Sequence, residues 1–426
     1  MRKMTKKRVI GTTILGNIVE YYDFGIYAVF APMIGNVFFP LFGQALEILL
    51  SFSVFAIGFL MRPFGGVIFG HIGDKFGRKV ALSMSIVGMA IATLTIGLLP
   101  SYKSIGIAAP IVLIVVRLFQ GLCIGGEGTG SAIFILEHLS KGGVSIAGSI
   151  VMASNVVGTL LANIVGLIIV ELIGLDEITW RYGFLAGAAI GVIGAYFRSK
   201  NSETPVFNEM QNDKRPKKMP IVRVIERKKY AVTLVISIAA AATSISYLIR
   251  GFLSTFFSEI MHYPHDQSLY FTFFALILVV VLLPIFGIFS EKIGYVKILL
   301  ISAISIIVCI YPLFKLISNI EHNIWYVFIG LAGISTLCAA IGAPAYPYAI
   351  KSFPPELRYS GVALGWNLGN AIFGGTTPLI CTLLTTRISA DAPSYYLIFT
   401  SSLFIMLNLL LMLMVYQLKN KSNNPL

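Results

Sequence analysis

The chain has 426 residues, of which 57% are hydrophobic and 12% are charged. Soluble domains carry about 25% charged residues, so the composition excludes an ordinary soluble protein and predicts a polytopic helical membrane protein. The formal net charge of +13 does not indicate nucleic-acid binding, because the bases cluster in short loops between apolar segments and form no basic surface domain.

Apolar segments along the chain predict an all-α membrane protein. A hydrocarbon core about 30 Å thick requires about 20 helical residues per span, and Gly and Pro are tolerated inside such helices when neighbours satisfy the backbone. The sequence predicts twelve spans, at approximately residues 10–36, 48–70, 80–100, 106–134, 146–170, 180–198, 230–257, 268–289, 296–317, 323–350, 359–384 and 394–416.

The 32 Lys and Arg residues predict the orientation of the spans. Most of them lie before the first span, after even-numbered spans or in the C-terminal tail. Because basic loops stay in the cytoplasm, both termini are expected there, in a multi-pass protein of the cell inner (cytoplasmic) membrane. We expect a monomer that contacts membrane lipids.

A polar segment at residues 199–229 predicts a cytoplasmic linker between an N-terminal six-helix bundle, 1–198, and a C-terminal one, 230–426. Its basic runs indicate contact with anionic lipid, although specific regulation through it is an alternative. Related Gly–acid–Lys–Gly patterns follow the second and the eighth span, at 70–79 and 287–297. The repeated pattern indicates duplication of a six-helix unit.

The first span contains two acids, Glu20 and Asp23. A carboxylate at the centre of a membrane helix costs about 2.5–3.5 kcal/mol, so it is rarely there without a task. The three-residue spacing places both acids on one helix face with Asn17 and Tyr27, roughly 15–20 Å along the axis and near the midplane. We favour proton coupling or binding over a purely structural ion pair.

Arg117 in the fourth span is expected at the same depth as Glu20 and Asp23. A buried guanidinium requires a carboxylate partner or an anionic ligand. Arg117 either neutralises one of the two acids permanently or exchanges between that acid and a substrate, and we favour exchange. Arg62 and Glu127 fall at matched depths near the cytoplasmic side, which indicates a structural pair at a gate; substrate contact is the less favoured alternative.

The spans from residue 268 onward contain no acid, so proton chemistry is assigned to Glu20, Asp23 or Glu127. The second half supplies neutral polar groups instead. We expect substrate contacts from spans seven and eleven, and the amides are equally suited to helix–helix contact. Arg250, near the outer end of span seven, either extends to the surface or attracts anionic substrates. The predicted substrate-binding residues are Asn17, Tyr27, Arg117, Tyr247, Trp366, Asn367 and Asn370.

Several motifs, spread over nearly the whole chain, resemble those of a known family. They are N-I-V-E-Y-Y-D-F at 17–24, R-P-F-G-G-V-I-F-G-H-I-G-D-K-F-G-R-K at 62–79, R-L-F-Q-G-L-C-I-G-G-E at 117–127, W-R-Y-G-F at 180–184, E-T-P-V-F at 203–207, F-P-P-E-L-R-Y-S-G at 353–361 and N-L-G-N-A-I-F-G-G-T-T-P at 367–378. The chain resembles the major facilitator superfamily, and within it the metabolite:H+ symporter family, which includes carriers of proline and betaine, citrate, 2-oxoglutarate and shikimate. Arg250 matches no motif of that family, and the C-terminal tail is too short for the coiled coil of some osmoregulatory members.

The resemblance implies two pseudo-symmetric six-helix bundles and proton-coupled uptake of a small molecule without a cofactor. It also implies that the loop after span two is a cytoplasmic latch that holds the outward-open state, with a weaker counterpart after span eight. The gating residues expected are the pair Arg62 and Glu127, from their matched depth, and the loop residues and their partners Asp74, Arg78, Glu137, Glu291 and Arg358.

A secondary transporter explains the spans, the repeat and the midplane charges together. An enzyme would need a nucleophile–base set or metal ligands at one depth, and ATP-driven transport would need a phosphate-binding loop; the sequence shows neither. Two unlike halves with buried charges fit a channel poorly. Aromatic residues such as Tyr21 and Tyr22 suit a quaternary ammonium, so proline or glycine betaine is the first substrate candidate. An organic-acid:H+ symporter is the alternative, and an exporter or antiporter is less favoured.

Overall fold

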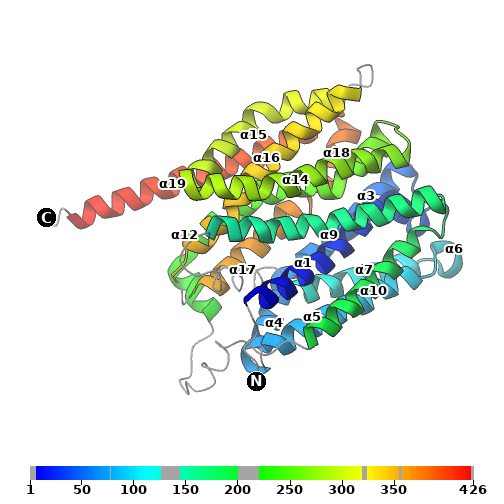
Figure 1. The fold of residues 1–426 in the computed structure, drawn as a ribbon, viewed down its shortest axis with the longest axis horizontal. Helices are drawn as coiled ribbons and strands as arrows, with labels where there is room; N and C mark the ends of the chain where they lie inside the picture. The colour runs from blue at the N-terminus through cyan, green and yellow to red at the C-terminus, as the bar shows by residue number, and fades with distance from the viewer. Residues whose placement is uncertain are drawn as a thin grey trace.

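A computed structural model of the protein describes residues 6–76, 78–125, 144–199, 220–318, 324–354 and 357–423, and these ranges are helical with no strand (Figure 1). Helices satisfy every backbone N–H and C=O group within one segment, which is the requirement for apolar sequence in lipid. The helices up to residue 199 are α1 (Lys6–Val29), α2 (Ala31–Phe38), α3 (Gln44–Leu60), α4 (Arg62–Phe76), α5 (Arg78–Leu98), α6 (Tyr102–Ile105), α7 (Ala108–Ile124), α9 (Val144–Leu172) and α10 (Trp180–Ser199).

The helices from residue 220 onward include three π-helical stretches, named η. The series is α12 (Pro220–Tyr247), η1 (Leu248–Phe252), α13 (Leu253–Thr255), η2 (Phe256–Ile260), α14 (His265–Ile293), α15 (Tyr295–Ile317), α16 (Ile324–Lys351), α17 (Arg358–Gly369), η3 (Asn370–Gly374), α18 (Thr377–Arg387) and α19 (Pro393–Asn423).

Eight segments of the described chain are long and apolar enough to cross a membrane, beginning with Gln44–Phe69 and ending with Pro393–Met414. Two further predicted spans contain shorter apolar helices, Ser83–Leu98 and Ala108–Ile124. The structure therefore supports a multi-pass helical protein, and the count of twelve stays a prediction. Residues 220–229, expected in the linker, form the first turns of α12, which has non-helical backbone at Lys228.

The surface has the polarity expected in lipid. One face of α5 exposes large apolar side chains at helical spacing, whereas many polar side chains are buried between the helices. Exposing this apolar surface to water would be unfavourable, whereas contact with lipid tails is favourable because they are apolar as well. The exposed stripe of α5 consists of Met84, Val87, Ile91, Leu94 and Leu98.

Three helical paths depart from regular α-helix, two of them at polar residues. The first breaks at Phe30, just before Pro32 enters α2, since proline supplies no backbone N–H. The path that includes α12 contains η1, which carries Arg250, and the path that includes α17 contains η3, which begins at Asn370. A π-turn adds one residue to a helical turn and is frequent at functional sites.

Helices α9 and α14 run side by side through the centre of the molecule (Figure 1). Small residues allow this approach: a Cβ atom on Gly287 of α14 would lie 2.9 Å from Cβ of Ser149 in α9. On the other side of α9, a Cβ atom on Gly25 of α1 would lie 2.8 Å from Cβ of Ala162. Glycine at such contacts lets membrane helices pack backbone to backbone. Helix α9 is thus held between α1 and the second half of the chain.

Candidate functional site

The polar face predicted for the first span lies inside the protein. Asn17, Glu20, Asp23 and Tyr27 of α1 are all at least 96% buried. Such burial is costly for carboxylates and amides unless partners or a ligand compensate, so the partners of this face define the candidate site.

Asp23 and Arg117 are joined by a buried chain of hydrogen bonds. Nη1 of Arg117 donates to Oε1 of Gln120 at 2.8 Å, and Nε2 of Gln120 donates to Oγ1 of Thr93 at 3.0 Å. The Thr93 hydroxyl donates to Oδ2 of Asp23 at 2.7 Å. This network links α7, α5 and α1. The two charges are therefore connected through two neutral side chains and not by a direct ion pair.

Arg117 rests on an aromatic surface. Its guanidinium carbon lies 3.6 Å from the centroid of the Tyr27 ring, and only 1% of the residue is exposed. The Tyr27 hydroxyl donates to the backbone oxygen of Ser51 in α3 at 2.9 Å, which fixes the ring. Nε and Nη2 of Arg117 have no hydrogen-bond partner among the described residues. The guanidinium therefore keeps donors that an anion can occupy.

Glu20 and Arg62 form a second polar centre. Arg62 of α4 is 98% buried, stacks over the rings of Phe59 and Phe24 at 4.1 and 4.6 Å, and interacts electrostatically with Glu20. Glu20 also interacts electrostatically with Tyr346 of α16, so it lies where the two halves of the chain meet. The expected partner of Arg62, Glu127, lies outside the described residues.

Aromatic residues from both halves meet at Tyr247. Its ring packs against Phe59 of α3 at 5.0 Å in an edge-to-face arrangement, and its hydroxyl is buried without a hydrogen-bond partner among the described residues. The Arg250 guanidinium lies over the Tyr247 ring at 4.5 Å and over the Tyr21 ring of α1 at 5.0 Å.

Arg250 differs from the sequence expectation. The sequence predicts a position near the outer end of span seven, but the helical path continues through η2 to Ile260, so Arg250 is well inside the segment. It does not extend to the surface: it packs between rings from α1 and α12, and its Nη1 is buried without a hydrogen-bond partner among the described residues.

The three polar or aromatic residues predicted in span eleven have different surroundings. Trp366 stacks on Tyr346 with centroids 4.1 Å apart. Nδ2 of Asn367 donates to the backbone oxygen of Gly125 at 3.2 Å, which ties α17 to the end of α7. Oδ1 of Asn370 is buried without a hydrogen-bond partner among the described residues. Of the three, Asn370 keeps the acceptor that a ligand can use.

On α1, Asn17 donates through Nδ2 to the hydroxyl of Ser154 in α9 at 3.2 Å. That bond joins two helices of the first half, which is the alternative role that buried amides have in membrane proteins.

The predicted gating residues are only partly described. Glu291, near the end of α14, accepts a hydrogen bond through Oε2 from the backbone N–H of Ser145 at 3.0 Å. Ser145 lies in the first turn of α9, where the helix dipole favours a negative charge. Asp74 lies in α4, and Arg78 and Arg358 begin α5 and α17, but their side chains, like residue Glu137, lie outside the described set.

Sequence reasoning missed two members of the Asp23–Arg117 network. Gln120 follows Arg117 by three residues and so shares its helix face, a signal that was present in the sequence. Thr93 is a hydroxyl within an otherwise apolar helix and carries no local signal; only the packing of α5 against α7 and α1 identifies it.

Neither the Asp23–Arg117 network nor the Glu20–Arg62 centre contains a cluster of metal ligands. Within the described ranges, no three His, Cys, Asp or Glu residues are grouped to hold a metal ion. The arrangement offers buried charges that can exchange partners, bounded by aromatic rings, at the contact between the first and second halves of the chain. Such a constellation suits binding and ion coupling.

Comparisons with known proteins identify the family. The family model for the Major Facilitator Superfamily matches residues 13–281 and 239–425. A putative proline/betaine transporter of Staphylococcus aureus is 32% identical over 402 residues, covering 93% of this chain and 85% of that protein. The proline/betaine transporter of Escherichia coli is 29% identical over 404 residues, covering 92% and 80%.

Solved structures show the same fold at lower identity. The xylose transporter XylE of Escherichia coli, in a partially occluded inward-open conformation, matches with a TM-score of 0.73 and 15% identity, covering 95% of this chain and 96% of that one. A D-xylose–proton symporter structure matches with a TM-score of 0.72 and 14% identity, covering 93% and 96%. The relatives are transporters, not enzymes. From the family match, the relatives and the fold together, this chain belongs to the Major Facilitator Superfamily of transporters.

Proposed function

We propose that the protein is a proton-coupled symporter that takes up a small zwitterionic metabolite of the proline or glycine betaine type. The observation that carries the proposal is the buried network from Asp23 through Thr93 and Gln120 to Arg117. A buried carboxylate such as Asp23 readily takes up a proton. When Asp23 becomes neutral, the partly unpaired guanidinium of Arg117 is free to bind an anionic group of the substrate.

The substrate class follows from the relatives and from the chemistry of the site. Relatives about 30% identical over most of the chain are named proline/betaine transporters. Both solutes carry a carboxylate, which a buried arginine can bind, and a cationic amine, which aromatic rings and acids can balance. Glu20, Tyr21 and Tyr346 supply such groups at the contact between the halves.

The proposed topology is twelve spans in two six-helix bundles, with a linker at 199–229 and both termini in the cytoplasm. In Figure 1 the described part of α1 begins in the lower middle of the molecule, and α19 ends at the far left. The proposal includes a monomer in the cytoplasmic membrane, in contact with lipid. Asn17, Tyr27, Tyr247, Trp366, Asn367 and Asn370 are proposed to line the substrate path together with Arg117.

An organic-acid:H+ symporter is the second candidate. The arginines Arg62, Arg117 and Arg250 are all wholly or partly buried, and more than one of them is available for a solute with several carboxylates. Direct comparison of proline, glycine betaine, 2-oxoglutarate and citrate as substrates distinguishes the two candidates.

Reconstituted liposomes test the proposed function. With an inward proton gradient, labelled proline or glycine betaine should accumulate above its external concentration, and a protonophore should reduce the internal concentration to the external one. Equilibration that ignores the protonophore would indicate a facilitator or channel and contradict the coupling. Accumulation of citrate or 2-oxoglutarate alone would replace the proposed substrate class with the second candidate.

Glu291→Gln should shift the carrier toward the state that is open to the cytoplasm. The carboxylate joins α14 to the first turn of α9, and a charge at a helix N-terminus contributes about 1 kcal/mol, so the closed state should lose about fivefold in population. The readout uses Ser149→Cys, on α9 opposite Gly287, in a variant from which the native cysteines are removed. The rate at which maleimide labels this cysteine measures how often α9 and α14 separate. Glu177→Gln, at an exposed ion pair with Lys103, is the matched control. Equal labelling rates in both variants would exclude the gating role of Glu291.

A further inference from the structure

The two carboxylate oxygens of Asp23 have different surroundings. Oδ2 accepts the hydroxyl hydrogen of Thr93 at 2.7 Å. Oδ1 is buried and accepts no hydrogen bond from the described residues, in a residue of which 3% is exposed. Leaving a buried acceptor without a donor costs free energy, which indicates that a partner from outside the protein binds at Oδ1.

Gly187 of α10 faces this oxygen. Helices α1, α5 and α10 pack against one another in the first half of the chain (Figure 1). A Cβ atom at Gly187 would lie 2.9 Å from Oδ1 of Asp23 and 2.8 Å from Cε1 of Tyr22, so glycine is needed for this close approach. The Cα hydrogen that stands in place of the Cβ atom is a weak donor compared with N–H or O–H. Helix α10 therefore covers Oδ1 without a strong hydrogen bond to it.

The hydrogen bonds of the Asp23–Arg117 network all lead to Oδ2. Arg117 donates to Gln120, which donates to Thr93. The Thr93 hydroxyl in turn donates to Oδ2 of Asp23. Because this hydroxyl has one hydrogen, a proton on Oδ2 would require it to turn away and break the network. A proton on Oδ1 leaves all of these bonds in place.

Few other charged groups face Asp23. Arg117 of α7 and Tyr22 of α1 interact with it electrostatically. Glu20, one turn earlier on α1, interacts with Arg62 of α4. The stretches of α5, α9 and α10 nearest to this part of α1 carry no titratable side chain; they are residues 89–97, 155–166 and 183–191.

We propose that Oδ1 of Asp23 is the atom that binds the transported proton, and that Gly187 is the positioning residue that keeps this oxygen free of a competing donor. Proton uptake forms one O–H bond at Oδ1 and neutralises the carboxylate, while the Thr93 hydroxyl stays bonded to Oδ2. The proposal rests on the proposed function and deepens it, because it assigns the proton to one atom and gives α10 a part in coupling. No sequence motif includes Gly187.

Infrared difference spectroscopy of the purified full-length carrier, acidified in detergent, identifies the protonated oxygen. The carbonyl stretch of the neutral Asp23 carboxyl group should appear on acidification and be missing from Asp23→Asn. If Oδ1 carries the proton, Oδ2 is the carbonyl oxygen and accepts the Thr93 hydroxyl. Thr93→Val removes that hydrogen bond, so the band should move to a higher wavenumber.

The control for this spectrum lies on the same helix. Thr95 bonds to the backbone oxygen of Ile91 and is directed away from the network, so Thr95→Val should leave the band where it is. A band that Thr93→Val does not move would place the proton on Oδ2 and overturn the inference. The absence of any band that depends on Asp23 would overturn it as well.

Two substitutions of Gly187 test the role of the glycine. Gly187→Ala adds a Cβ atom, whereas Gly187→Ser adds the same carbon with a hydroxyl that can donate to Oδ1. A hydrogen bond to a carboxylate is stronger than one to a backbone carbonyl, so the hydroxyl should stabilise the charged form of Asp23. The pH of half-maximal uptake should therefore be about one unit lower in Gly187→Ser than in Gly187→Ala, which is about a tenfold difference in proton affinity. Liposomes at a constant proton gradient and varied external pH measure it.

Gly191, one turn further along α10, offers the matched pair of controls. A Cβ atom there would lie 2.9 Å from Cβ of Ala90 in α5, and the nearest atoms all belong to Ala90. Gly191→Ser and Gly191→Ala should therefore share one pH of half-maximal uptake. Because each readout compares two variants at one position, a loss of folded protein does not imitate it. Equal values for the two variants of Gly187 would overturn its assigned role.

The outcomes separate this inference from the proposed function. A band that moves in Thr93→Val, in a carrier that accumulates no solute, would support the assignment to Oδ1 and reject proton-coupled uptake. Conversely, proton-driven accumulation by a carrier whose band ignores Thr93→Val would support the proposed function and overturn the inference.

Discussion

Replacing Asp23 with asparagine should abolish proton-driven accumulation while solute exchange across the membrane continues. A membrane potential is worth about 2.3 kcal/mol per charge per 100 mV, which supports an accumulation of about 50-fold when one proton enters with a neutral solute. Asparagine has the shape of the carboxylic acid and can accept the hydrogen bond from Thr93, but it cannot release or take up a proton. The internal-to-external ratio should therefore fall to about one.

Two transport assays on the same liposomes measure the effect. Accumulation under a proton gradient should be lost, and counterflow exchange, which needs no net proton movement, should stay within about threefold of the unmodified carrier. Glu171→Gln removes an exposed acid that accepts a hydrogen bond from Tyr270, and it should preserve both activities. If Asp23→Asn reduces exchange as much as accumulation, the acid is structural and Glu20 becomes the proton carrier.

The sequence predicts the position of Asp23 and Glu20 on the helix but not their partners. Their spacing on one helix predicts a shared face and a shared depth, and both side chains are indeed buried. The spacing does not distinguish the roles of the two acids, because their partners come from different helices. Asp23 meets Thr93 of α5, whereas Glu20 acts on Arg62 of α4 and Tyr346 of α16. Such pairings depend on how the helices pack, which no local pattern encodes.

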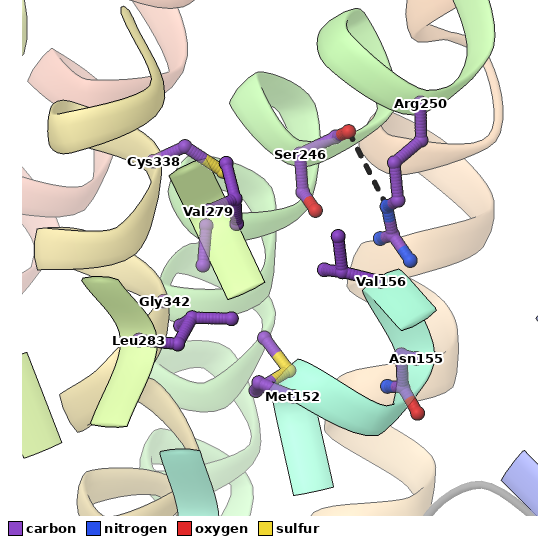
Figure 2. Close-up of a pocket in the computed structure, with 10 residues that line it drawn as sticks. Met152, Asn155, Val156, Ser246, Arg250, Val279, Leu283, Cys338 and Gly342 are labelled. Atoms are coloured by element: carbon purple, nitrogen blue, oxygen red, sulfur yellow. Dashed lines mark hydrogen bonds between the residues drawn. The ribbon is translucent and has the colours of Figure 1, made fainter. Parts of the chain in front are cut away.

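Arg250 illustrates a different limit. The expected end of span seven predicts a shallow position, but the helical path continues through η1 and η2, and Arg250 lies near Val156 of α9 (Figure 2). A π-turn has no strong sequence signature. Hydropathy does not show how far a helix continues beyond the hydrocarbon core of the membrane, and it does not show which way the side chains point. The class of protein was predictable because composition and hydropathy are properties of the whole chain. The contact of Arg250 with α9, α14 and α16 was not, because these helices are far apart in sequence.

Arg117→Gln should stop uptake altogether, by about 100-fold or more, and should also destabilise the folded carrier. The side chain is fully enclosed on the Tyr27 ring and is the cationic end of the network that reaches Asp23. The substitution breaks the buried hydrogen bond from Arg117 to Gln120 and leaves the buried Asp23 less compensated, which costs about 1–3 kcal/mol. Uptake that survives in this variant would remove Arg117 from the transport site.

A double-mutant cycle separates the two roles of Arg117. If its charge balances Asp23 through Gln120 and Thr93, then Asp23→Asn together with Arg117→Gln leaves no uncompensated charge, and thermal unfolding should return to within a few degrees of the unmodified carrier. Uptake should stay absent, because restoring neutrality does not restore a proton-binding group or an anion-binding donor. Strictly additive losses of stability would instead mean that the hydrogen bonds between these residues transmit no charge coupling, and the two side chains would then act independently.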